Sequence, residues 1–281
     1  MQTAERSCLL CDSTSSRVLL RREFPRFVVC RNCGFVFQNP QPTAEAMNAH
    51  YKQGYWEVRS GQPELVPESN WRLNDRALAL VEWTRDLIGP GQLAVELGCG
   101  NGYLLSALKE SHGCDVLGIE PSEMAAQQGR ERGLDVVCGN IETVKLARPA
   151  RLVVLSHVLE HLHEPVETLT KCRDLLEDSG FLWIEVPNIL TPHPAKRLSS
   201  WLQFEHLWYF SPQSLTALLA RSGFRAIRTD GRGYVRILAE CAVPVAEKYE
   251  GHDYLSVWAA VVGHEFKYWP RRVARRLIGR S

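Results

Sequence analysis

The chain has 281 residues, of which 45% are hydrophobic and 23% are charged, so it can build a sizeable core and does not have the composition of a disordered protein. Its formal net charge of +1 excludes a global positive field that would draw it onto nucleic acid. No apolar run of about 18 residues is present, which excludes a membrane span, and the N-terminal stretch lacks the apolar core of a signal peptide, so we expect a cytoplasmic protein.

Residues 1–40 are predicted to form a compact module held together by four cysteines. Two Cys-x-x-Cys pairs, separated by 18 residues, can complete a tetrahedral thiolate site with no position left open, which predicts a structural zinc ion in a ribbon or knuckle. Four free core thiols and a redox pair are the alternatives. Short strands are expected at Val18-Leu19-Leu20 and Phe27-Val28-Val29. The four predicted ligands are Cys8, Cys11, Cys30 and Cys33.

The other five cysteines are scattered, mostly in apolar stretches, and are predicted to be small core residues. The odd total of nine also argues against a disulfide scaffold.

Residues 41–90 are predicted to form a helical linker with an irregular middle. Gly54 to Pro67 is rich in turn residues, and apolar residues recur at helical spacing from Asp75 until Gly89-Pro90-Gly91 ends the pattern. Tyr51, Tyr55 and Trp56 in this segment would suit a lid over an active site, and ordinary packing between modules is the alternative.

Residues 91–240 alternate between short apolar strands and amphipathic helices. Units of this length imply an α/β domain with a mostly parallel sheet of seven strands and helices on both faces. Strands are expected at 92–97, 115–119, 136–138, 152–155, 181–186, 226–229 and 235–240, and helices at 103–111, 121–132, 165–177 and from Ser211 to Gly223. The connection from Thr191 to Phe204 is too long for a plain loop and is expected to help form a substrate pocket.

Residues 241–281 are predicted to be a helical tail, with one or two helices between Trp258 and Ile278. Residues 267–281 contain six Lys or Arg and no acid. Aromatic and aliphatic residues among these cations would suit contact with an anionic membrane surface. A solvated terminal helix is the alternative.

The first predicted strand of the alternating region ends in a glycine-rich turn, Gly98-Cys99-Gly100-Asn101-Gly102. Such a turn lets the backbone approach a ligand closely, at the carboxyl end of a strand where nucleotides usually bind. The turn lacks the Lys-Ser/Thr ending of a phosphate loop and departs from the dinucleotide spacing. Glu96, two residues before the first glycine, would repel a pyrophosphate and would suit a ligand that carries a positive charge.

Two further signals follow the next strands. Glu120, followed by Pro121, ends the second strand about 20 residues after the glycines, where an acid can accept both hydroxyls of a ribose. Asn140-Ile141 follows the third strand, where a polar residue and an aliphatic one could bind and cover an adenine ring.

Four segments, in their order and spacing, resemble the class I S-adenosylmethionine-dependent methyltransferases: VELGCGNGYL, GIEPS, GNIE and SHVLEHL. The resemblance covers roughly residues 90–240 and implies a Rossmann-like three-layer fold. It implies that Glu96, Gly98, Cys99 and Gly100 face the methionine part of the cofactor, Glu120 and Pro121 the ribose, Asn140 and Ile141 the adenine, and that Ser156 and His157 flank the methionine and the reacting methyl group. A nucleotide-binding fold with another ligand is the alternative.

The cysteine module in front of such a domain is similar to the arrangement in sugar C-methyltransferases of deoxysugar biosynthesis and their relatives in natural-product and surface-polysaccharide pathways. The similar segments include Gly34–Pro40, Glu185–Asn188 and Phe204–Pro212. Those C-methyltransferases have a further large C-terminal domain for which this chain has no room, so O- and C-methylation both remain open.

Methyl transfer to oxygen or carbon usually needs a base, and the unperturbed pKa of histidine suits that role. His206 is the first candidate, with Glu205 beside it as an orienting or substrate-binding group; in the resembling family this pair belongs to the substrate site. A tyrosine often stands two residues before the histidine there, and this chain has Phe204. The alternative for His206 is a capping residue that supports Trp208, Tyr209 and Phe210.

A second histidine cluster, His157-x-x-Glu160-His161, matches an inverted zinc-protease pattern. It follows a predicted buried strand instead of lying inside a long helix, so we reject that interpretation.

The sequence therefore predicts a methyltransferase with a small-molecule or glycan acceptor, such as a sugar or a secondary metabolite, and no nucleic-acid partner. The alternatives are a non-catalytic scaffold protein that binds the cofactor and a nucleic-acid methyltransferase, which would need a basic patch that the balanced charge does not suggest. The oligomeric state and the identity of the acceptor are not predicted.

Overall fold

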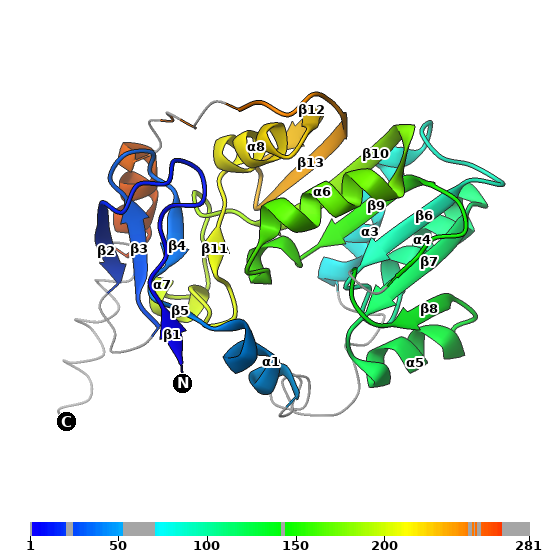
Figure 1. Ribbon diagram of the computed structural model, residues 1–281, viewed down its shortest axis with the longest axis horizontal. Helices are drawn as coiled ribbons and strands as arrows, with labels where there is room; N and C mark the ends of the chain where they lie inside the picture. The colour runs from blue at the N-terminus through cyan, green and yellow to red at the C-terminus, as the bar shows by residue number, and fades with distance from the viewer. Residues whose placement is uncertain are drawn as a thin grey trace.

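The computed structural model describes residues 2–20, 25–52, 71–141, 144–246, 249, 251 and 254–265. Its centre is a seven-stranded sheet in the order β12-β13-β10-β9-β6-β7-β8 (Figure 1). The strands β6, β7, β8, β9 and β10 pair with one another in parallel, whereas β13 runs antiparallel to both β10 and β12. The predicted seven-stranded, mostly parallel sheet is therefore confirmed. The strands are β6 (Leu93–Leu97), β7 (Asp115–Glu120), β8 (Asp135–Cys138), β9 (Ala150–Ser156), β10 (Leu176–Pro187), β12 (Phe224–Asp230) and β13 (Tyr234–Cys241).

Helices cover both faces of this sheet because its central strands are apolar on both sides. Val153 and Leu155 of β9 pack in one core cluster, and Leu152 and Val154 pack in the other. The first cluster includes side chains of α6 (Pro165–Leu175) and α8 (Pro212–Arg221), whereas the second includes side chains of α3 (Trp71–Thr84), α4 (Tyr103–His112) and α5 (Glu123–Glu131). The result is the three-layer arrangement expected from alternating strands and helices.

Helix boundaries follow local capping chemistry. Ser211 caps α8 as predicted, since its hydroxyl accepts a hydrogen bond from the Ser214 amide at 3.1 Å in a capping box. The predicted helix at 121–132 begins later, because Ser122 is the N-cap and Pro121 precedes it. The predicted helices ending near Ile88 and Glu177 end earlier, at Thr84 and Leu175.

A second sheet, in the order β11-β4-β3-β2, is built around the N-terminal cysteines. Its strands β2 (Ser16–Leu20) and β3 (Phe27–Cys30) contain the two predicted strands of the module. β4 (Val36–Gln38) pairs with β11 (Trp208–Tyr209), which comes from far along the chain. β1 (Thr3–Ala4) and β5 (Gln41–Pro42) form a small ladder beside it.

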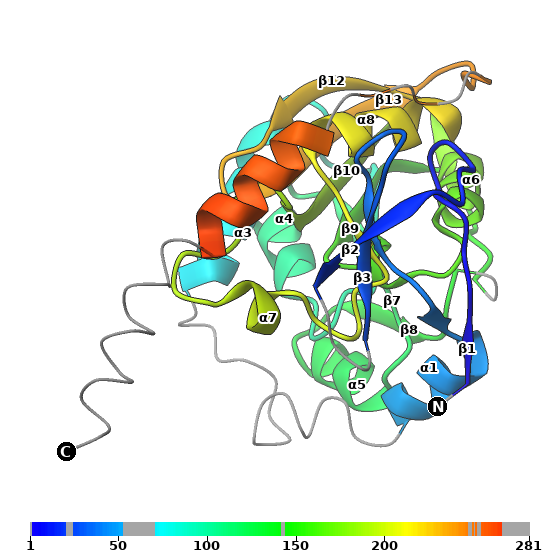
Figure 2. The same cartoon turned by 90° about the vertical axis from the view of Figure 1, so that its left-hand side faces the viewer.

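Several short helices surround this second sheet. Residues 254–265 form a helix (Figure 2), and its Val257 and Val261 belong to the same core cluster as Phe27 and Val29 of β3. α7 (Leu198–Trp201) lies within the long connection from Thr191 to Phe204, and α1 (Ala44–Lys52) and the short helix η1 (Leu159–His161) complete the set.

Two parts of the predictions lie outside the described residues: the irregular segment with Tyr55 and Trp56, and the basic stretch 267–281. Within the described part of the chain, no helix has the length and apolar character needed to span a bilayer.

Candidate active site

The glycine-rich loop connects β6 to α4 at the carboxyl edge of the central sheet. The Gly98 amide donates to the Ile119 carbonyl of β7 at 2.7 Å, which anchors the start of the loop. Gly98, Gly100 and Gly102 all have positive φ, a conformation that glycine adopts without strain. A Cβ on Gly100 would meet nothing within 4 Å, so the loop backbone faces open space there. The side chain of Cys99 packs in the core, so only its backbone can face a ligand.

Glu96 lies in β6, directly before this loop, with 2% of its surface exposed. Its Oε2 atom is buried and has no hydrogen-bond partner. Burial raises the pKa of this carboxyl well above its ordinary value, although the nearby Arg76 guanidinium acts in the opposite direction. A buried carboxyl oxygen without a partner indicates that a cationic group of a ligand is its natural counterpart.

Glu120 ends β7 beside the loop and orders the neighbouring backbone. One carboxylate oxygen accepts from the Gly100 amide and the other from the Ser122 amide, both at 2.9 Å. Burial raises the pKa of Glu120, and the two amide hydrogen bonds oppose that shift. Each oxygen keeps a lone pair for a further donor such as a ribose hydroxyl. Of the other residues predicted for this side, Pro121 and Asn140 are exposed and Ile141 is half-buried against the core.

Ser156 and His157 lie where β9 ends, opposite the glycine loop. The Ser156 hydroxyl is buried and has no hydrogen-bond partner. His157 has a φ of 55°, which is rare outside glycine, and its amide donates to the Glu185 carbonyl at 2.9 Å. Strained residues of this kind cluster at functional sites. Two polar residues predicted to flank the reacting methyl group therefore lie side by side at this edge of the sheet.

A buried ionic network fixes the His157 ring. Glu185, which has no exposed surface, pairs with His157 Nε2 at 3.1 Å, Arg76 Nε at 2.6 Å and Arg236 Nε at 2.5 Å. Burial opposes the charge of Glu185, but His157 and the two arginines outweigh it and lower its pKa to about 2. The network connects α3, β10, β13 and the residue that follows β9 through one carboxylate.

His157 also approaches a second buried carboxylate, Glu160, whose Oε1 atom is 3.2 Å from His157 Nδ1. Burial and the Arg76 charge disfavour the charged imidazole, yet Glu160 and Glu185 outweigh them and raise the pKa of His157. His157 is thus held between two carboxylates, a position that favours its imidazolium form.

Three imidazoles surround Glu160, which has no exposed surface. A carboxylate oxygen of Glu160 and one ring nitrogen each of His161 and His206 lie within 4.8 Å of one another. The rings of His161 and His206 meet edge to face, with centroids 4.7 Å apart. Burial opposes the Glu160 charge, but His157, His161 and His206 outweigh it and lower its pKa to about 2.

The candidate base His206 is 4% exposed and follows the half-exposed Glu205. The Glu205 carbonyl accepts from His161 Nδ1 at 3.0 Å, so the backbone of Glu205 joins the same cluster. The His206 ring lies 5.5 Å from the Tyr209 ring, which belongs to β11. The structure therefore brings His206 to the second sheet as well as to Glu160.

The four predicted zinc ligands converge. One sulfur atom from each of Cys8, Cys11, Cys30 and Cys33 lies within 4.8 Å of the others, and the Cys8–Cys33 and Cys11–Cys30 sulfur pairs are 3.5 Å apart. Shared protons between the sulfurs raise the pKa of Cys8 and lower that of Cys30 to about 2. Four thiols this close fit a divalent cation that replaces their protons.

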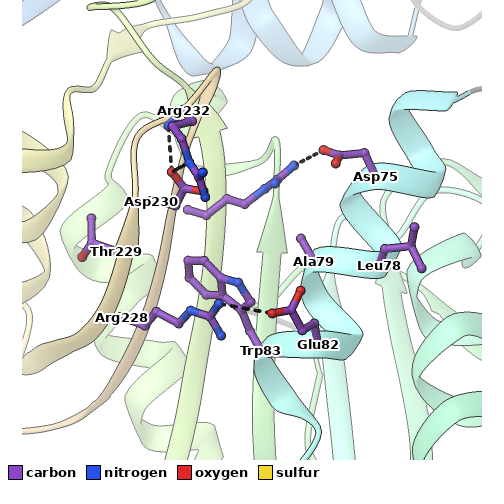
Figure 3. Close-up of a pocket in the computed structure, with 10 residues that line it drawn as sticks. Asp75, Leu78, Ala79, Glu82, Trp83, Arg228, Thr229, Asp230 and Arg232 are labelled. Atoms are coloured by element: carbon purple, nitrogen blue, oxygen red, sulfur yellow. Dashed lines mark hydrogen bonds and ion pairs between the residues drawn. The ribbon is translucent and has the colours of Figure 1, made fainter.

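A charged pocket of about 460 Å³ lies between α3 and β12 (Figure 3). Its three arginines are each paired with an acid: Arg228 with Glu82 at 3.4 Å, Arg232 with Asp230 at 3.1 Å and Arg236 with Asp75 at 2.6 Å. Since the cations are already neutralised, the pocket does not have the free positive charge of an anion site. Its link to the candidate active site is Arg236, which also binds Glu185.

The motifs singled out the two acidic residues, the glycine loop, the histidines and the cysteines. In the structure the acidic residues and the loop lie at the carboxyl ends of β6 and β7, the histidines gather around Glu160, and the cysteines form a separate cluster. The motifs did not indicate Arg76 and Arg236. These arginines stand in a helix and a strand without a recognisable spacing, and only the tertiary fold places them on Glu185.

Comparisons with known proteins give consistent matches. A family described as Methyltransferase domain matches residues 72–229. The ubiquinone biosynthesis O-methyltransferase of Roseobacter denitrificans is 28% identical over 177 residues, which cover 55% of this chain and 69% of that protein. The C-methyltransferase NovU of Streptomyces niveus is 24% identical over 206 residues, which cover 71% of this chain but only 46% of that protein.

Solved structures share the fold at low identity. The [4+2]-cyclase SpnF superposes with a TM-score of 0.56 at 16% identity, covering 73% of this chain and 98% of that one. A chain of the complex between the Haloferax volcanii Trm112 methyltransferase activator and a methyltransferase gives 0.51 at 16% identity, covering 70% of this chain and 97% of that one. A cyclase among these structures means that the fold alone does not define the reaction.

Proposed function

The chain belongs to the Methyltransferase domain family and is an S-adenosylmethionine-dependent methyltransferase, and we propose that its acceptor is a hydroxylated ring compound, such as a sugar or a secondary metabolite. The reaction we propose is methylation of a hydroxyl group on the ring or of a ring carbon. A structural zinc ion in the cysteine module supports the acceptor side of the site.

The observation that carries the cofactor assignment is the buried Oε2 atom of Glu96, which has no hydrogen-bond partner, together with the open space at Gly100. In this assignment Glu96 binds the ammonium group of the cofactor, Glu120 the ribose and Asn140-Ile141 the adenine, while the Ser156 hydroxyl and His157 flank the methionine part. Once bound, S-adenosylmethionine supplies a sulfonium methyl group that a nucleophile can accept. Glu96 would also favour a positively charged ligand over a pyrophosphate, which distinguishes the site from a dinucleotide site.

On the acceptor side, we assign His206 as the base. It takes the proton that the acceptor's hydroxyl or carbon loses as the nucleophile forms. The buried Glu160 carboxylate, within 4.8 Å of a His206 nitrogen, stabilises the imidazolium that results. Glu205 is the first candidate to hold the acceptor at the edge of the site, since it is half-exposed and adjacent to His206.

The comparisons support methylation of oxygen or of carbon, because one relative is an O-methyltransferase of ubiquinone biosynthesis and another is a C-methyltransferase. The side chains near His206 support a ring-shaped acceptor: the buried Tyr209 ring lies 5.5 Å from the His206 ring and 5.3 Å from the Trp201 ring, and aromatic side chains suit contact with sugar and aromatic rings. We expect no nucleic-acid acceptor and a cytoplasmic setting.

We propose the domain division that the sequence indicates: a zinc module at 1–40, a helical segment at 41–90, the cofactor domain at 91–240 and a helical tail beyond. The four converging sulfur atoms are the support for zinc, and Cys8, Cys11, Cys30 and Cys33 would hold the ion. A closed thiolate site supplies a cross-link and leaves no position for a substrate, so its contribution would be structural.

The test combines cofactor binding with turnover. S-adenosylhomocysteine should raise the melting temperature of the wild-type protein, because a ligand that binds only the native state stabilises it. Labelled S-adenosylmethionine should transfer its methyl group to at least one member of a panel that runs from catechol to dTDP-linked hexoses. His206→Gln should keep the thermal shift and lose turnover about 100-fold or more.

The outcomes separate the parts of this proposal. Absence of a thermal shift at saturating ligand would favour a scaffold protein. A shift without transfer to any panel member would reject the acceptor class, and full turnover by His206→Gln would reject the base assignment.

A further inference from the structure

The strand β4 of the cysteine module contains a glutamine that local structure does not explain. Gln38 has no exposed surface, and neither the nitrogen nor the oxygen of its side-chain amide has a hydrogen-bond partner. An amide buried in this way costs free energy, and native proteins rarely leave one unsatisfied without a functional reason. Asn188 gives the comparison within the same chain: its amide donates to the Gly231 carbonyl at 2.8 Å and accepts from the Leu190 amide at 2.9 Å.

The position of Gln38 connects it to the proposed base. Its backbone amide donates to the carbonyl of Leu207, the residue after His206, at 2.9 Å. In the sheet its register partner is Phe27, whose ring lies 5.7 Å from the Tyr209 ring. The Tyr209 ring in turn lies 5.5 Å from that of His206. Side chains of directly opposed residues share a face of the sheet, so the amide lies on the face that carries Phe27.

The sheet face that carries Gln38 is apolar and aromatic. Phe27, Trp201 and Tyr209 are buried there in one cluster. The His206 ring lies 5.5 Å from the Tyr209 ring, and an oxygen of Glu160 lies within 4.8 Å of a His206 nitrogen. An amide that both donates and accepts, beside aromatic side chains, suits a ring that carries neighbouring hydroxyl or carbonyl groups.

We propose that the cysteine module forms one wall of the acceptor site and that the Gln38 amide hydrogen-bonds the hydroxyl or carbonyl groups of a ring-shaped methyl acceptor. This inference rests on the proposed function and assigns part of the acceptor's recognition to a module outside the cofactor domain. The bound acceptor supplies the partners that Gln38 lacks. Gln38 is thereby a specificity-determining residue, and the base remains His206.

The first arm of the test measures stability in the absence of acceptor. Gln38→Met keeps the size of the side chain and removes the unsatisfied amide, so its melting temperature should equal or exceed that of the wild type. Asn188→Leu is the matched control, because it removes an amide whose two hydrogen bonds are made, and its melting temperature should fall. A fall for Gln38→Met comparable to that of Asn188→Leu would mean that the amide is structural and would overturn the proposal.

The second arm measures turnover with the panel member that the wild type methylates best. Gln38→Met should raise the KM for this acceptor about tenfold or more, the effect of losing one buried hydrogen bond, with the KM for S-adenosylmethionine unchanged. A wild-type KM for the acceptor would overturn the role of Gln38 and leave the proposed function intact. If the wild type methylated no panel member, the acceptor class would fail and this inference would fail with it.

Discussion

Glu96 places a carboxyl group where it is 2% exposed and where its Oε2 atom has no hydrogen-bond partner. Arg76 supplies opposing charge from a distance, but burial dominates and the pKa of Glu96 is raised well above its ordinary value. The residue is therefore unfavourable for the stability of the fold and favourable for binding a cation. Glu120, by contrast, receives two backbone amides and contributes to the order of the loop.

We therefore predict that Glu96→Gln changes stability and cofactor affinity in opposite directions. A raised folded-state pKa means that stability is greatest below the unfolded pKa and is lost as pH rises toward the folded value. Without cofactor, Glu96→Gln should therefore be at least as stable as the wild type, with an advantage that grows as the pH rises above the ordinary pKa of a glutamate. Its affinity for S-adenosylhomocysteine should fall about 10- to 100-fold, because a charged hydrogen bond is lost. Thermal unfolding across pH and calorimetric titration check both signs, and unchanged affinity with lower stability would contradict the assignment.

The glycine loop is the element whose conformation most directly decides cofactor binding. Gly100 and Gly102 both have positive φ, so alanine at either position should cost about 1–2 kcal/mol of backbone strain. The two positions differ in their surroundings: a Cβ on Gly100 meets nothing within 4 Å, whereas one on Gly102 would lie 2.3 Å from Leu134 Cδ1. Gly102→Ala should therefore lose more stability, and Gly100→Ala should lose more cofactor affinity because its Cβ fills the space kept for the ligand.

Thermal unfolding and calorimetric titration of the two variants measure this difference. Equal losses of affinity in both would mean that the space above Gly100 does not face the cofactor.

The strands and helices of the cofactor domain could be predicted because their apolar periodicity is strong and their ends carry local signals, as at Ser211. The two Cys-x-x-Cys pairs likewise indicated a common site. The pairing of β11 with β4 could not be predicted, since a strand of two residues has no periodicity and its partner lies far away in the sequence. The same limit applies to Arg76, Arg236 and Gln38, whose significance depends on burial and on partners that only the fold defines.

The two sheets of the molecule are connected on several sides. The Arg221 guanidinium of α8 donates to the Leu9 and Leu10 carbonyls, between the first two cysteines, at 2.7 and 3.0 Å. His163 Nε2 lies 2.8 Å from the Pro42 carbonyl at the other end of the module. A third connection is the pairing of β11 with β4, and β11 begins two residues after His206. The cofactor loop, in contrast, follows β6 and is anchored to β7, and both strands belong to the central sheet.

This arrangement predicts that loss of the metal affects turnover more than cofactor binding. The purified protein should carry one zinc ion per chain, and Cys33→Ser should lose it, because a closed site of four thiolates does not tolerate the loss of one ligand. The second sheet should then loosen, and with it β11 and His206. Turnover should fall by at least about an order of magnitude, as expected when a catalytic group is misplaced. Affinity for S-adenosylhomocysteine should stay near that of the wild type, because Glu96, Gly100 and Glu120 lie on the central sheet.

Native mass spectrometry, calorimetric titration and methyl-transfer assays measure these three quantities in one preparation. Cys241→Ser is the matched control, since Cys241 is a half-buried thiol in β13, apart from the four clustered cysteines, and its variant should retain zinc and turnover. If zinc-free Cys33→Ser kept full turnover, the module would be a separate attachment that does not position His206. If it lost cofactor binding in proportion to turnover, the two sheets would form a single cooperative unit in which the metal stabilises both sites equally.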